Sequence, residues 1–130
     1  MQQNFEEFAK SERELEIWNN GELVFQSDKK MVGGLLDFIQ DGASRFTDLT
    51  IFDKRAGNAV ALLCAYSGVK EIYAVLGSQA AAKTFDEFKI KFHFLETIPH
   101  ILNQAENDIC PLEKKSFSKN PEEFYQAIKI

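Results

Sequence analysis

The chain lacks most of the features that mark membrane, secreted and nucleic-acid-binding proteins. It has no apolar run near the roughly 20 residues that a membrane-spanning helix needs. It has only two cysteines, Cys64 and Cys110, which lie far apart and form no C-x-x-C pair. Its formal net charge of -5 shows no excess of basic residues. These absences argue against a membrane protein, a disulfide scaffold and a general nucleic-acid binder.

The first residues also lack the pattern of a signal peptide. Residues 1–11 carry Glu6 and Glu7 and show no basic region followed by an apolar one. With so few cysteines, the sequence predicts a reduced, cytoplasmic protein without membrane contact.

The composition is that of a folded domain. The chain has 130 residues, of which 45% are hydrophobic, and these values predict one domain over residues 1–130. Phe accounts for 12 residues, against 3 Tyr and 1 Trp, so we expect a core built largely from phenyl rings.

Residues 47–59 are the most informative segment. A β-rich strand at 49–52 is followed by Asp53, two basic residues and a glycine, and an alanine-rich helix is expected over 55–67. A strand that leads directly into a helix places the free N–H groups of that helix at the carboxyl end of the sheet. Ligands of open α/β proteins bind there, so the segment predicts a ligand site.

The rest of the chain shows alternating strand and helix patterns. The expected elements are a helix near 5–9, hairpin strands 14–18 and 22–25, a helix that starts between 27 and 34 and runs to about 40, strands 71–76 and 90–95, helices 78–88 and 99–103, and two final helices that begin near 111 and 121. Strand–helix–strand units favour parallel pairing through right-handed crossovers. The pattern predicts a three-layer α/β/α sandwich around a mixed sheet of about five strands.

Three segments resemble one uncharacterised prokaryotic family. They are Asp53-Lys54 with Gly57 and the alanine-rich helix, the G-V-K-E-I-Y-A segment at 68–74, and the D-I-C-P-L-E segment at 108–113. The family carries only a "domain of unknown function" label and has the cytidine deaminase-like fold. The resemblance covers roughly residues 12–116 and implies a single deaminase-like domain whose function is unassigned.

The best-known proteins of that fold are zinc deaminases, and this chain departs from their pattern. They need a His or Cys near a Glu at one helix mouth and P-C-x-x-C at the next. The first mouth here, residues 27–33, holds Asp28, Lys29 and Lys30, and the second, residues 53–57, has no cysteine. A catalytic zinc needs three protein ligands. We therefore expect no zinc site, no other cofactor and no zinc-dependent deamination.

The second mouth supplies the main ligand-binding candidates. Asp53 could accept hydrogen bonds from a ribose or a base edge, or it could simply cap the helix. Lys54 and Arg55 could bind a phosphate or carboxylate, or could form a solvated surface pair. Gly57 allows either close helix packing or the approach of a ligand to the backbone.

The remaining candidates lie nearby or in the last third of the chain. Gly77 and Ser78 end the neighbouring strand and could join the rim, or they could form a turn and a helix cap. Cys110 could be a nucleophile activated by a helix N-terminus, or an inert buried thiol. Glu113 could act as a general acid or base, or could complete a helix cap.

These observations favour a domain that binds a nucleotide-like or other small anionic ligand without a catalytic zinc. The alternatives are a metal-independent enzyme that uses Cys110 or the pair Asp53 and Glu113, and a structural or partner-binding protein that forms a homodimer. The sequence leaves open whether the protein is an enzyme.

Overall fold

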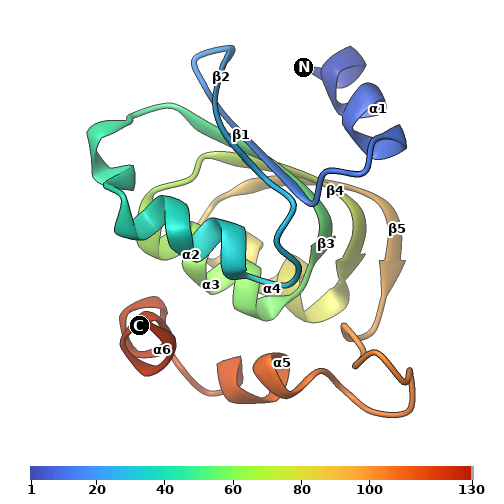
Figure 1. The fold of residues 1–130 in the computed structure, drawn as a ribbon. Helices are drawn as coiled ribbons and strands as arrows, with labels where there is room; N and C mark the ends of the chain where they lie inside the picture. The colour runs from blue at the N-terminus through green and yellow to red at the C-terminus, as the bar shows by residue number, and fades with distance from the viewer. Residues whose placement is uncertain (130) are drawn as a thin grey trace.

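A mixed five-stranded sheet organises the chain in the computed structural model, which describes residues 1–129 (Figure 1). The strands are β1 (Leu15–Asn19), β2 (Glu22–Ser27), β3 (Leu49–Ala56), β4 (Glu71–Ser78) and β5 (Lys91–Ile98). Their order in the sheet is β2-β1-β3-β4-β5. β1 pairs antiparallel with β2 and β3, whereas β3, β4 and β5 run parallel. The predicted mixed sheet is confirmed.

Helices cover both faces of this sheet (Figure 1). The helices are α1 (Gln2–Lys10), α2 (Gly33–Gln40), α3 (Asn58–Ser67), α4 (Gln79–Glu87), α5 (Pro111–Ser116) and α6 (Pro121–Ile128), with a 3₁₀ turn η1 (Ala43–Arg45). α1 lies on one face, and α2, α3 and α4 lie on the other, with α5 and α6 packed outside α3. The layers are those of the predicted α/β/α sandwich. No helix within residues 1–129 is long and apolar enough to cross a membrane.

Local sequence signals account for the main turns. Asn20 and Gly21 have φ values of 51° and 83°, as the tight turn of the β1–β2 hairpin requires. α3 ends at Gly68, whose φ of 80° suits a left-handed C-cap. Ser78 caps α4, because its side chain accepts a hydrogen bond from the Ala81 N–H at 2.9 Å.

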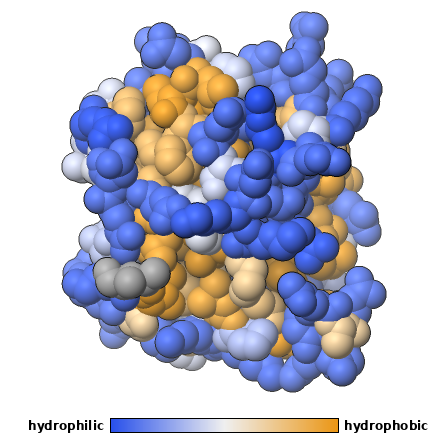
Figure 2. Space-filling model, viewed as in Figure 1, coloured by the Kyte–Doolittle hydropathy of each residue, from blue (hydrophilic) through white to orange (hydrophobic). Residues whose placement is uncertain are grey.

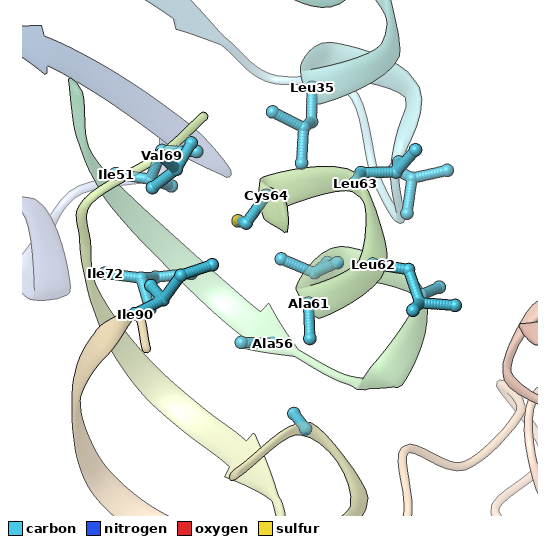
Figure 3. Packing of buried hydrophobic residues seen from close by; sticks show 14 of the residues in the cluster. Leu35, Ile51, Ala56, Ala61, Leu62, Leu63, Cys64, Val69, Ile72 and Ile90 are labelled. Carbon is cyan, nitrogen blue, oxygen red and sulfur yellow. The ribbon is translucent and has the colours of Figure 1, made fainter. Parts of the chain in front are cut away.

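The main core lies between the sheet and the α2–α4 layer (Figure 3). Ile51 and Ile72 project from the sheet toward Cys64 of α3, and all three side chains are fully buried. α3 is apolar on nearly every side because the sheet lies under it and α5 and α6 cover it from outside. The alanine-rich sequence is therefore that of a central helix.

A second, smaller cluster lies on the face that α1 covers. Phe5 and Phe8 of α1 pack on Phe52, with ring centroids 5.4 and 5.8 Å from it. The five largest fully buried side chains of the chain are phenyl rings: Phe8, Phe38, Phe52, Phe85 and Phe124. The expected phenylalanine-rich core is present.

The surface is mostly hydrophilic in the view of Figure 2, with hydrophobic residues showing near the β1–β2 hairpin and where the C-terminal helices approach the α2–α3 layer. The C-terminal helices α5 and α6 therefore cover apolar surface that α3 and its neighbours would otherwise expose.

Several expected elements differ from the structure. The helix predicted over 99–103 is absent, because Leu102 instead forms an antiparallel bridge with Ile109. The strand predicted over 49–52 continues to Ala56, and the helix predicted from residue 55 begins only at Asn58. The strand is longer because Arg55 and Ala56 still pair with β4.

Candidate functional site

The N-terminus of α3 binds a carboxylate from a distant part of the chain. The Oε2 and Oε1 atoms of Glu113, in the first turn of α5, accept hydrogen bonds from the backbone N–H groups of Asn58 (2.7 Å) and Ala59 (2.8 Å). Gly57 has no Cβ, and a Cβ there would lie 2.5 Å from the Glu113 carboxyl carbon. The carboxylate satisfies free N–H groups of the helix and complements its dipole.

Buried polar side chains hold Glu113 in this position. The Asn58 side-chain amide donates to Ser116 Oγ at 2.9 Å, and Ser116 Oγ donates to the Glu113 carbonyl at 2.6 Å. The Thr84 hydroxyl of α4 donates to the Asn58 side-chain oxygen. Asn58, Glu113 and Ser116 are at most 8% exposed. The network joins α3, α4 and α5 at one point.

The environment of Glu113 also shifts its protonation. Burial raises the pKa of its carboxyl above the usual value, and the Ala59 and Asn58 N–H groups and His100 act in the opposite direction. The His100 ring packs edge-on against Phe117, with centroids 5.7 Å apart. Its Nδ1 is buried and has no hydrogen-bond partner within residues 1–129. An acid and an imidazole therefore lie near each other beside the helix.

The sequence indicated that Asp53 lies at the end of its strand. In the structure, Asp53 lies inside β3. Its neighbours in sequence, Phe52 and Lys54, contact the α1 side, so Asp53 faces the α3 side, near Cys64. Burial, with a contribution from Glu14, raises the pKa of Asp53 to about 8, against the lowering effect of hydrogen bonds from backbone N–H groups. Asp53 does not cap α3, since Gly57 holds the N-cap position. At neutral pH it is a buried, protonated acid.

The two basic residues of this segment point in different directions. The Lys54 ammonium donates to the backbone carbonyls of Ser11 and Arg13, the latter at 2.8 Å, and lies 4.8 Å from the Phe8 ring centroid. Lys54 therefore anchors the α1–β1 connection on the opposite face of the sheet from α3. Arg55 is exposed at the end of β3.

Gly77 and Ser78 continue β4 beside this segment. A Cβ at Gly77 would lie 2.2 Å from the Phe94 ring, so the glycine permits close packing with β5. The Ser78 hydroxyl is fully buried and serves as the N-cap of α4. Ser78 forms the helix cap that the sequence suggested as an alternative to ligand binding, whereas Gly77 lies within β4 and not in the suggested turn.

Both cysteines are free and buried. Cys64 belongs to the main core, and burial raises its pKa well above the usual value. Cys110 is 7% exposed at the N-cap of α5, and its backbone N–H donates to the Ile101 carbonyl at 2.9 Å. A buried thiol is poorly placed to react with a solute.

Sequence reasoning missed most of the polar network. Asn58, Thr84, Ser116 and His100 were not singled out, and Glu113 was considered only as an acid, a base or a cap of its own helix. The available signal was weak. An acid in the first turn of α5 and a glycine before α3 fit together only when the two helices are known to be adjacent.

The residues at the two helix mouths do not fit the zinc of the deaminase fold. At the start of α2, the Lys29 ammonium pairs with Asp37 at 2.6 Å, and a cation repels a metal ion. At the start of α3, the groups that point into the mouth are backbone N–H groups, which donate hydrogen bonds and cannot ligate a metal. Within residues 1–129, no group of three or more His, Cys, Asp or Glu side chains is placed to hold a metal ion.

Comparison with known proteins identifies both a family and a fold. The model of a family described as "Domain of unknown function (DUF1893)" matches residues 5–130. The crystal structure of a DUF1893 family protein from Thermotoga maritima is similar, with a TM-score of 0.84 and 24% identity, over 98% of this chain and 86% of that one. A search of curated proteins finds no match.

A deaminase has a related fold at greater distance. The dCMP deaminase of cyanophage S-TIM5, in its apo form, is similar with a TM-score of 0.51 and 11% identity, over 71% of this chain and 91% of that one. At sequence identities of 24% and 11%, structural similarity shows only that the folds are alike. They support the deaminase-like architecture that the sequence predicted.

Proposed function

The chain belongs to the DUF1893 family, a domain of unknown function, and on this premise we propose that it binds a small anionic or nucleotide-like ligand at the N-terminus of α3. The ligand's anion exchanges with the Glu113 carboxylate, which occupies the helix mouth in the absence of ligand. No catalytic zinc takes part.

The single observation behind this proposal is the contact between Glu113 and α3. The Asn58 and Ala59 N–H groups receive the oxygens of one carboxylate at 2.7 and 2.8 Å. A phosphate or carboxylate of a ligand has the same charge and presents similar oxygens. Gly57 leaves room for such a group against the backbone. In this interpretation Glu113 stands in for the anion of the ligand.

Three further features agree with a nucleotide-like ligand. Asp53 holds a proton at neutral pH, so it can donate a hydrogen bond as well as accept one. Arg55 is exposed at the end of β3 and can screen an anionic charge there. The related fold is that of a deaminase named for a nucleotide substrate, dCMP. Gly77 and Ser78, with their structural partners, would contribute only by shaping the rim, and Lys54, whose side chain lies on the opposite face of the sheet, would not contact the ligand.

Thermal unfolding with added phosphate, CMP, dCMP or AMP tests the proposal. A bound probe at 100 times its dissociation constant should stabilise the wild-type protein by about 2.7 kcal/mol. The same probe should stabilise Glu113→Gln more strongly, because the competing charge is gone. Glu122→Gln, an exposed change in α6, should respond like the wild type.

Asp53→Ala distinguishes binding of the nucleoside part of the ligand from binding of its phosphate. It should weaken the response to a nucleotide while leaving the response to inorganic phosphate intact. If none of the probes stabilises either the wild type or Glu113→Gln, the proposal is wrong, and Glu113 serves only to join α5 to α3.

A further inference from the structure

A groove of about 580 Å³ lies on the other face of the sheet, between α1 and the β1–β2 hairpin. Figure 1 shows α1 and the tip of this hairpin on the same side of the sheet. The volume lies within the range of about 300–1,000 Å³ that is typical of small-molecule sites. The groove is therefore large enough for a metabolite, and the sheet separates it from the N-terminus of α3.

The charges that line the groove are mostly negative. Glu7, Glu12, Glu16 and Asp28 contribute carboxylates, and Arg13 is the single basic residue among the lining side chains. Arg13 is already paired with Glu16 at 2.6 Å. Within residues 1–129, no ion pair involves the other three carboxylates. The groove therefore has negative charge to offer to a ligand.

Aromatic surface accompanies this charge. Phe8 and Trp18 line the groove, together with Leu23 of β2. Phe52 packs against Trp18, with ring centroids 5.7 Å apart, and the Trp18 indole N–H donates a hydrogen bond to the Glu16 carboxylate at 3.3 Å. Glu16 is only 5% exposed and Trp18 is half-buried, so this part of the wall is held in place. The exposed part of the Trp18 ring and the carboxylates together favour a cation with an apolar body.

We propose that this groove is a binding site for a small organic cation, an amine or guanidinium carried on an apolar or aromatic body. The charged group lies among Glu7, Glu12 and Asp28, and the apolar body lies against Trp18 and Leu23. The chemistry is opposite in sign to that of the ligand proposed for α3, so either proposal can hold without the other.

Trp18 makes the test direct, because it is the single tryptophan of the chain and lines the groove. Titration with phenethylamine should change its fluorescence in a saturable way. Phenethyl alcohol, which has the same apolar body without the charge, should bind about tenfold more weakly or not at all, since two or three attractive carboxylates together suffice for such a factor.

Variants locate the site. Glu7→Gln combined with Glu12→Gln should weaken phenethylamine binding by about tenfold, and because both side chains are exposed the fold should persist. Glu87→Gln, an exposed change in α4, should have no effect. No saturable change with the amine would overturn the proposal. So would equal binding of the alcohol, or an unaltered affinity in the double variant.

Discussion

Asp53→Asn should make the protein more stable at neutral and alkaline pH. Asn has nearly the same size, and its side-chain oxygen can still accept the hydrogen bond that the Arg55 N–H donates to Asp53 at 3.2 Å. The substitution removes a buried carboxyl group. That group must either keep its proton or carry a charge in the interior with no ion-pair partner. The substitution therefore isolates the cost of burying an ionisable acid at this point.

The sign and size follow from the pKa of about 8 in the folded protein. Between the pKa of the unfolded chain, about 4, and that of the folded one, the folded state holds one more proton than the unfolded state. Stability therefore falls as pH rises through this window, by about 1.4 kcal/mol per pH unit. From about pH 5 to about pH 7 the wild type should lose about 2.7 kcal/mol that the variant keeps. The full difference above pH 8 is on the order of 5 kcal/mol.

Urea unfolding followed by circular dichroism, at several pH values from about 5 to 9, measures this difference. Glu14 and Lys54 are the charged groups that act on Asp53, and Cys64 stays neutral because its own pKa is raised. Asp48→Asn, an exposed change just before β3, provides the control and should leave the pH profile unaltered. Parallel pH profiles for the wild type and Asp53→Asn would refute the reasoning, because the carboxyl would then not be protonated in the folded state.

Three further predictions concern packing and reactivity. Glu113→Gln should lower the free energy of unfolding by about 1–2 kcal/mol in denaturant titrations, because Gln has only one side-chain oxygen for the two N–H groups and leaves one of these buried donors without an acceptor; an unchanged midpoint would contradict this. Gly77→Ala should cost about 2 kcal/mol because its Cβ meets the Phe94 ring, whereas Gly33→Ala, which meets only a flexible lysine, should be nearly neutral. Cys110 should react with iodoacetamide far more slowly in the folded protein than in urea, and comparable rates would show that its thiol is accessible.

The fold was accessible from sequence because its signals are local. The turn at Asn20-Gly21, the cap at Ser78 and the alternation of buried strands with helices each depend on residues close together in the chain. Parallel pairing then follows from the handedness of the crossovers. Such signals locate elements well and their ends less well, as the extension of β3 to Ala56 illustrates.

The candidate site was only partly accessible because its main contact is not local. Gly57 and Glu113 were both singled out, yet nothing in the sequence pairs an acid in α5 with a helix 55 residues earlier. The burial of Asp53 was hidden for a related reason. A strand that seemed to end at the acid left it at an exposed rim, whereas three more strand residues, two of them paired with β4, place it under α3.

The attachment of the C-terminal helices to α3 also affects how the protein is made. A ribosome completes the sheet and α2–α4 before it has synthesised Glu113 and the residues of α6. Until then, the nascent chain carries a central helix with a bare N-terminus and an uncovered apolar side. Long-range contacts form late and leave such intermediates prone to aggregation. Folding therefore finishes only when α5 and α6 emerge, and until then the incomplete chain exposes the kind of apolar surface that chaperones bind.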